Sequence, residues 1–258
     1  MQQLKLFFNA VPFGLVLLAC SGTTADKTKS AGNSGPAPAS GSGKDMYYEY
    51  VSTTGSKDMT IKTNTRMYIS SGGDMRVEMD MENSRGKGPV KIVTIGHSDK
   101  PNESISIEDG DKTYSINHFR DSDFNTGQKV QSTATKIGEE KILGFNSVHA
   151  KIISNKSIGS LYSNTDTLDL WRSNEVPLLA SVKELMEKFD TKTGMLYSPD
   201  VAAQLKQMGC EGFMTKLELH SKHTSVTETL VKVEHRDLPS NIFQIPAGYK
   251  ETKNGIGE

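Results

Sequence analysis

Residues 73–82, GDMRVEMDME, carry the clearest structural pattern in the chain. Every second residue from Met75 to Met81 is apolar, and each residue between them is charged. This period of two is typical of a β-strand with one buried and one exposed side, because successive side chains point to opposite faces. The stretch therefore predicts a strand at the edge of a core. Its methionines are interpreted as core residues rather than as soft ligands for copper.

Neighbouring stretches show the same alternation. Further strands are predicted for residues 46–53, 59–69, 90–96, 103–109 and 112–119. Short glycine-containing segments separate several of them, and Asp109-Gly110 suits a tight hairpin turn. Because such turns leave no room for crossover helices, the six strands are expected to form an antiparallel meander.

The second half of the chain continues with strands and ends in a tail. A polar loop is expected at residues 121–133. Strands are predicted as a pair from Lys136, and at residues 165–173, 213–221 and 224–237. Residues 238–251 contain two prolines among apolar side chains, so this tail is expected to run in extended form along a sheet edge.

Two helices are predicted between these strands. Residues 178–189 have apolar side chains at helical spacing after Pro177, and a second helix begins at Ser198-Pro199 and ends at Gly209. A sheet of this size cannot leave its apolar face uncovered. We therefore expect a mainly β (α+β) fold, in which a curved antiparallel sheet forms an incomplete barrel and a two-helix lid covers its apolar face.

The sequence LVLLACSG at residues 15–22 predicts a lipid anchor. The apolar run that follows Lys5 has the length of a signal peptide and is too short to span a bilayer. The residues just before Cys20 resemble a bacterial lipobox, which implies removal of residues 1–19 and acylation of Cys20. An ordinary signal peptide with an unrelated cysteine is the alternative. Ser21, in place of an aspartate, favours the outer membrane.

The remaining sequence divides into a linker, a domain and a short tail. Residues 20–45 have almost no large apolar side chains and are rich in Gly, Ser, Pro and Ala, which predicts a flexible linker. Residues 46–252 are expected to form one half-barrel domain, since they are numerous enough for a core. Residues 253–258 are left as a C-terminal tail, and a monomer is expected.

Charge and motifs exclude several functions. The net charge is −1, with acidic and basic residues interspersed, so no nucleic-acid partner is predicted. The chain has no G-x-S-x-G, H-E-x-x-H or Walker motif, and nothing identifies a base for Cys210. We therefore predict no enzymatic activity and no cofactor, and interpret Cys210 as a small buried residue.

Two weak metal patterns are also rejected. Asp121, Asp123 and Asn125 have the spacing of the first ligands of a calcium loop, but Ser132 stands where an acidic ligand should close it. A solvated polar loop is therefore the favoured interpretation. His220 and His223 would point to opposite faces of a strand, so they do not predict a zinc site.

Five stretches together carry a resemblance to a known family: GDMRVEM, DGDKTYSI, ILGFNSVHAKI, LDLWRSNEVP and DLPSNIFQIPAGYKE. They resemble a domain-of-unknown-function family of bacterial envelope lipoproteins, similar to the carriers LolA and LolB and to the lipoprotein LppX. The resemblance implies an incomplete barrel that wraps around helices and leaves an apolar cavity for acyl chains. No counterpart of the carriers' arginine is found, since Arg66, Arg76 and Arg172 are all expected on strand surfaces.

These expectations lead to a function and a set of residues. We predict a non-enzymatic envelope lipoprotein, anchored to the membrane through acylated Cys20, that binds or carries an apolar or amphiphilic ligand such as a lipid or lipoprotein acyl chain. The alternative is a structural or interaction lipoprotein with a filled core. The residues expected to line a cavity, if the interior is not simply core, are Trp171, Leu179, Val182, Leu185, Met186 and Phe189.

Overall fold

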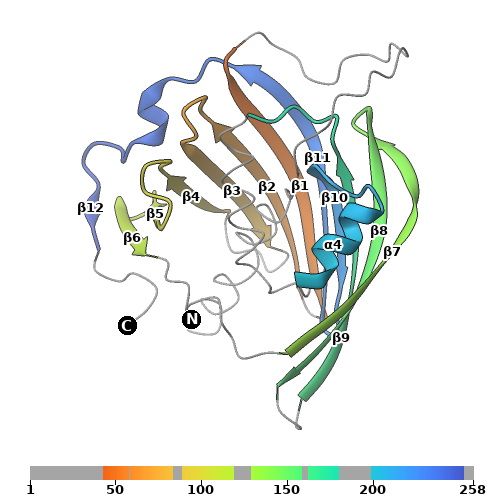
Figure 1. The fold of residues 1–258 in the computed structure, drawn as a ribbon. Coiled ribbons are helices and arrows are strands. Elements are labelled where there is room, and N and C mark those ends of the chain that lie inside the picture. Colours follow the sequence, from red (N-terminus) through yellow and green to blue (C-terminus); the bar gives the residue numbers. More distant parts are fainter. Residues whose placement is uncertain are drawn as a thin grey trace. The chain divides into compact units, whose positions relative to one another are not determined.

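The computed structural model describes residues 43–57, 59–83, 89–118, 129–158, 162–179 and 199–252. The chain divides into two compact units, which we name by their main features. The meander unit contains residues 39–125 and 218–258, and the helix unit contains residues 126–217. Both units consist mostly of β-strands in open, antiparallel sheets, which confirms the predicted fold class at this level (Figure 1).

The meander unit holds the six strands predicted from alternation. Its strands lie in the order β12-β6-β5-β4-β3-β2-β1-β11, and all pairs are antiparallel except β12 with β6. β2 and β4 begin and end at the predicted residues. The strands are β1 (Asp45–Ser56), β2 (Met59–Ile69), β3 (Met75–Asn83), β4 (Val90–Gly96), β5 (Glu103–Glu108), β6 (Thr113–His118), β11 (Thr224–Arg236) and β12 (Lys250–Glu251).

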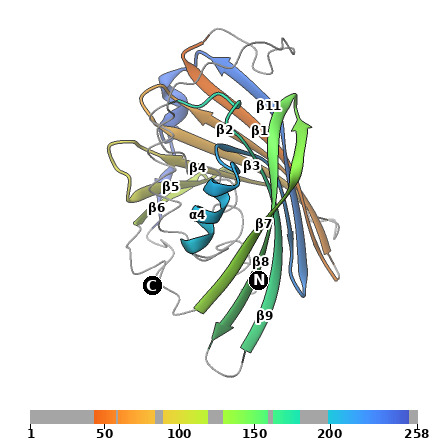
Figure 2. The ribbon, with the colours of Figure 1, turned by 45° about the vertical axis from the view of Figure 1, so that its right-hand side comes forward.

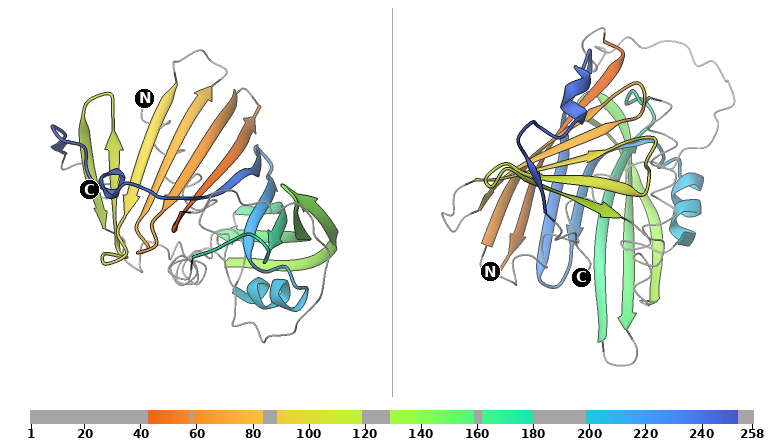
Figure 3. Two further views of the ribbon diagram at one scale, coloured as in Figure 1. Left: turned by 90° about the horizontal axis from the view of Figure 1, so that it is seen from above. Right: turned by 90° about the vertical axis from the view of Figure 1, so that its left-hand side faces the viewer.

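The C-terminal tail returns across the meander from β11 to β6, as both views in Figure 3 show. The prediction of a wholly extended tail was wrong, because a short 3-10 helix, η2 (Ser240–Phe243), interrupts it. Phe243 packs with the buried side chains of Val93, Ile95 and Ile107. The 3-10 turn is stabilised because it allows this apolar contact with the sheet. The last part of the prediction is confirmed, since β12 pairs with the edge strand β6.

Hydrogen bonds fix both ends of the tail. The carboxylate of Asp45 accepts hydrogen bonds from the backbone N–H groups of Ser71, at 2.7 Å, and Leu238, at 2.8 Å. Burial alone would raise the pKa of Asp45, but these hydrogen bonds outweigh it and lower the pKa. At the other end, Tyr249 donates to Asp109 at 2.6 Å. The tail is therefore part of the fold of the meander unit.

Two hairpin turns bear on the turn expectation, and they differ from it. Asp109 and Gly110 belong to a four-residue connection between β5 and β6, and the positive φ of 49° lies at Lys112. The two-residue turn lies in the helix unit, where Leu143 and Gly144 have φ values of 53° and 86°. Positive φ at both positions matches the twist of paired strands.

The helix unit consists of β7 (Lys129–Ile142), β8 (Phe145–Ile158), β9 (Tyr162–Ser173), α4 (Pro199–Gln207) and β10 (Phe213–His220) up to Leu217. The long strands β7 and β8 bend along their length (Figure 2). The predicted polar loop at residues 121–133 was too long at its end, because β7 already begins at Lys129. The first residues of this strand are mostly polar, so they show no apolar alternation from which a strand could be predicted. In the sheet they pair across strands, as the Ser132 and Ser154 hydroxyls do at 2.8 Å.

Helix α4 confirms the second predicted helix. It begins at Pro199 and ends before Gly209, whose φ of +71° closes the helix. The N–H groups of Gly209 and Cys210 donate to the carbonyls of Lys206 and Leu205, which is the Schellman arrangement. Gln204 accepts a hydrogen bond from the backbone N–H of Ala134 on β7, at 2.8 Å. This contact fixes α4 beside β7.

The predicted two-helix lid is described only in part. Leu179 lies at the start of the first predicted helix but is not part of any helix or strand, and residues 180–189 lie outside the described residues. The single described α-helix is α4, with Val201 and Leu205 buried. The incomplete barrel over residues 46–252 concerns both units together, so it stays a prediction.

Candidate functional site

One face of the meander unit is largely apolar. The strand registers place alternate side chains of β1, β2, β3 and β11 on this face, and its apolar members have exposed fractions from 0% to 7%. We call it the methionine face. Its members are Met46, Tyr48, Tyr50, Met67, Ile69, Met75, Val77, Met79, Met81, Leu230 and Val233.

The composition of the methionine face matters for what it can bind. Five of the chain's 11 methionines lie on it. Methionine is unbranched and polarisable, so its side chain adapts to irregular apolar surfaces and is frequent at surfaces that accept varied ligands. The strand predicted from residues 73–82 thus places its methionines inward, as expected.

A carboxylic acid lies within this apolar environment. Glu228 lies on the same face of β11 as Val226 and Leu230. All three side chains are buried, and Glu228 is 3% exposed. No hydrogen-bond or ion-pair partner of its carboxyl group occurs among the described residues. Burial raises the pKa of Glu228 to about 7. Glu228 was not among the residues predicted from the sequence, although a charged residue at an apolar position of the alternating stretch TSVTETL marks it.

The opposite face of the meander unit carries ion pairs. Arg66 lies 3.1 Å from Glu78 and also pairs with Asp80. The guanidinium of Arg236 lies over the ring of Tyr47, 3.6 Å from its centroid. Since these charges are compensated within the face, it is suited to contact with solvent more than to capture of a charged ligand.

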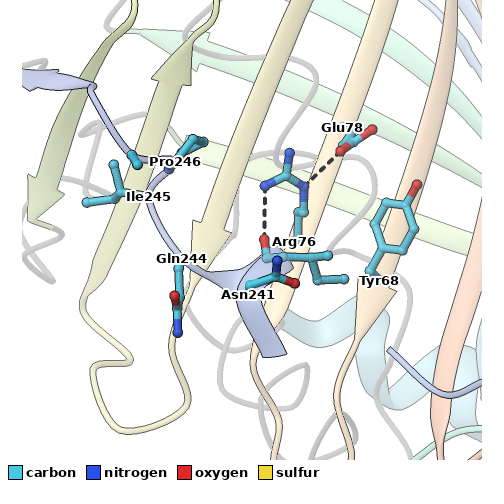
Figure 4. A pocket seen from close by; sticks show the side chains of 9 residues that line it. Tyr68, Arg76, Glu78, Asn241, Gln244, Ile245 and Pro246 are labelled. Carbon is cyan, nitrogen blue, oxygen red and sulfur yellow. Dashed lines mark hydrogen bonds and ion pairs between the residues drawn. The ribbon is translucent and has the colours of Figure 1, made fainter. Parts of the chain in front are cut away.

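A hollow of about 440 Å³ lies between this charged face and the tail (Figure 4). Arg76 stands at its centre and donates from Nε to Glu78, at 2.8 Å, and from Nη1 to the carbonyl of Ile242, at 2.9 Å. Because Arg76 is paired on two sides, it joins the tail to the sheet and does not present a free charge. The other lining residues are Tyr68, Asn241, Gln244, Ile245, Pro246 and Ala247.

In the helix unit, Trp171 belongs to a row of polar side chains. Its ring stacks on His149 with centroids 3.9 Å apart, and Lys216 Nζ lies 4.3 Å from the ring centroid. His149 Nε2 is 2.8 Å from Asp169 Oδ1. The Trp171 Nε1–H is buried and has no acceptor among the described residues. These contacts lie on the face opposite Leu170, since neighbouring residues of β9 point to opposite faces.

A hydroxyl group two residues from His149 on β8 is engaged in hydrogen bonds of its own. The nearest hydroxyl in sequence, Ser147, is fully buried and bonded to the hydroxyl of Thr215 at 2.8 Å. Thr215 in turn bonds the carbonyl of Trp171, at 3.2 Å. Ser147 and Thr215 thus form a small hydrogen-bond network that joins β8, β9 and β10.

Two further residues of the helix unit are buried. Arg172 has no exposed surface, so the prediction that it lies on a strand surface was wrong: it is in phase with Leu168 and Leu170, which face the core. Cys210 is also fully buried, and its thiol lies 3.4 Å from the carbonyl of Val148. Burial raises the pKa of Cys210 to about 11, although the charge of Arg172 acts against it. Such a thiol is a poor nucleophile.

Most residues predicted to line a cavity cannot be placed. Trp171 and the half-buried Leu179 are described, and their joint role with the first predicted helix stays a prediction. Cys20 and the polar loop from Asp121 to Asn125 lie outside the described residues, as do Val182, Leu185, Met186 and Phe189.

Neither a group of metal ligands nor a membrane-spanning helix occurs among the described residues. Their His, Cys, Asp and Glu side chains form no group of three or more that could hold a metal ion. Within the same residues, no helix has the length and apolar character needed to cross a membrane.

The family model "Domain of unknown function (DUF4412)" matches residues 53–249. The chain belongs to the DUF4412 family. The match covers most of both units, from β1 through the tail to Tyr249, and it confirms the resemblance to a domain-of-unknown-function family. No curated protein is significantly similar to this DUF4412 chain in sequence.

Two solved structures are distantly similar to the DUF4412 chain. The first is a DUF1329 family protein from Desulfovibrio piger, with 10% identity, a TM-score of 0.36, and coverage of 78% of this chain and 90% of that one. The second is a LolA superfamily protein from Nitrosomonas europaea, with 9% identity, a TM-score of 0.32, and coverage of 81% and 94%. Similarity this distant assigns no ligand or activity.

Proposed function

We propose that this DUF4412 protein is a non-enzymatic lipoprotein of the bacterial envelope that binds an apolar or amphiphilic ligand on the methionine face. Acylated Cys20 anchors it, with the outer membrane as the favoured site. The methionine face supports the binding role because it combines a wide apolar surface with adaptable side chains. Such surfaces accept acyl chains through burial of apolar area, without needing exact shape.

The alternative is a structural or interaction lipoprotein with a filled core. Its supporting observation is the low exposure of the methionine face, at most 7%, since a face that is already buried leaves little room for a ligand. The two functions differ in one measurable property, which is whether an added acyl chain reaches the methionine face.

Photolabelling tests this property. The full chain is held in lipid vesicles with a fatty acid that carries a photoreactive diazirine, and the labelled peptides are mapped by mass spectrometry. The binding role predicts labelling on β2 and β3 that an excess of unlabelled fatty acid suppresses. Labelling that is absent from these strands, or that does not saturate, favours the filled core.

A pair of variants gives the test a control. Met79→Phe places a larger side chain on the methionine face, and Val51→Phe does the same on the opposite face, where Val51 is 47% exposed. The binding role predicts that Met79→Phe changes the labelling and that Val51→Phe does not. Circular dichroism of both variants checks that they fold.

Anchoring is tested separately. Cells are fed an alkyne-bearing fatty acid, and the chain is isolated and examined for the label. Acylation of Cys20 predicts labelling of the natural chain and none of Cys20→Ala. Equal labelling of both chains would contradict a lipid anchor at Cys20.

A further inference from the structure

Glu228 stands at one end of the methionine face, beside hydroxyl groups. The registers place Glu228 opposite Ser52 on β1, Ser52 opposite Thr63 on β2, and Thr63 opposite Met81 on β3. Directly opposite residues of antiparallel strands share a face. A short polar row thus borders the apolar surface, with the carboxyl group at its β11 end.

The buried carboxyl group is costly without a partner. Glu228 is 3% exposed, and its neighbours along the strand on this face, Val226 and Leu230, are apolar. An ionised carboxylate in such a place loses its hydration, and the described residues form no hydrogen bond or ion pair with it that would compensate. Natural proteins retain buried polar groups of this kind mainly where they are used, and a lone one on an apolar surface points to a ligand group that completes it.

Charge complementarity defines that group. A second anion beside ionised Glu228 would add repulsion at low dielectric, so fatty acids and phosphate-bearing head groups fit poorly at this end of the face once Glu228 has lost its proton. An ammonium group compensates the carboxylate and donates several hydrogen bonds, which the hydroxyls of Ser52 and Thr63 can also accept. The adjoining methionine face supplies the apolar contacts that an attached alkyl chain needs.

We infer that Glu228, Ser52 and Thr63 form the head-group end of a site for a long-chain alkyl ammonium compound, whose chain lies along the methionine face. The inference rests on the proposed function and deepens it, because it names the class of the ligand. Glu228 acts here as a binding residue.

The test compares two photoreactive probes of equal chain length on the full chain in vesicles, one with a primary amine and one with a carboxylic acid. Unlabelled alkylamine competes with the amine probe. The inference predicts saturable labelling of β3 and β11 by the amine probe. In Glu228→Gln, about tenfold more alkylamine should be needed for half-maximal competition, as expected for loss of a charged hydrogen bond.

Two controls make the result decisive. Glu234 lies on the same strand and forms a partly exposed ion pair with Lys232. Glu234→Gln should leave unchanged the alkylamine concentration needed for half-maximal competition. Labelling by the carboxylic acid probe should persist in Glu228→Gln, which shows that the variant folds. Equal competition in Glu228→Gln and the natural chain overturns the head-group inference and leaves the proposed function intact. Saturable labelling by neither probe overturns both.

Discussion

Replacement of Glu228 by glutamine should stabilise the protein at alkaline pH. The natural carboxyl group is 3% exposed on an apolar face, and burial raises its pKa from the ordinary value of 4.5 to about 7. Between these two values the folded state binds more protons at this site than the unfolded state does. Stability contributed by the protonated group is therefore complete below pH 4.5 and is lost as the pH rises through about 7.

The size of the effect follows from the two pKa values. A change from 4.5 to about 7, at about 1.4 kcal/mol for each tenfold step, makes ionised Glu228 cost about 3 kcal/mol of unfolding free energy. Part of this cost is already present at pH 5, so the free energy of unfolding should fall by about 2–3 kcal/mol between pH 5 and pH 8. Glutamine resembles the protonated acid in shape and cannot ionise. The variant should therefore lose this slope.

Urea unfolding of the full chain in a non-ionic detergent, followed by far-ultraviolet circular dichroism at several pH values, measures the slope. Glu234→Gln is the matched control, because that carboxylate pairs with Lys232 and Arg236, which lower its pKa. The control should keep the slope of the natural chain. If Glu228→Gln retains the slope, or is less stable than the natural chain at pH 8, then Glu228 is not ionised within an apolar surface and the reasoning fails.

Three other perturbations test the remaining contacts. Cys210, with its pKa raised to about 11, should resist alkylation at pH 8 in the folded chain and react fully in denaturant, and mapping of the adducts by mass spectrometry would expose any early reaction. Phe243→Ala should cost about 3–5 kcal/mol in urea unfolding, because it empties a site packed on Ile95; a cost under about 1 kcal/mol would contradict that packing. Arg76→Ala removes the bonds to Glu78 and the Ile242 carbonyl, so it should cost about 1–3 kcal/mol and speed amide exchange in the tail, and unchanged exchange there would refute its joining role.

The alternating pattern predicted much of the meander unit because it is local. Residues 59–69 and 90–96 form strands with the predicted boundaries, and the methionines of β3 face the core as expected. β3 buries every second side chain from Met75 to Met81, and β2 does so from Thr65 to Ile69, so their burial is visible in their own residues. The end of α4 was predictable for a similar reason, since Gly209 is needed for the positive φ that closes the helix.

Other features were not predictable, because they depend on partners far away in the sequence. The start of β7 at Lys129 depends on pairing with β8, and the 3-10 turn at Phe243 depends on apolar side chains of β4 and β5. Arg172 has the charge of a surface residue, yet its phase on β9 places it with the core. The charge of Arg172 could not indicate that it is buried, because the two faces of β9 differ only in what packs against them.

The candidate site shows the same division. Local order in the sequence specified the strands, their inward methionines and the lipobox-like segment at Cys20. The amino-acid order also contained Glu228 in the apolar phase of its strand, but gave no sign of which residues would surround it. Strand pairing placed it beside Ser52, about 175 residues earlier in the chain, and beside the methionine face. Desolvation depends on neighbours in space, so the unusual pKa and the proposed ligand chemistry arise from the assembled sheet.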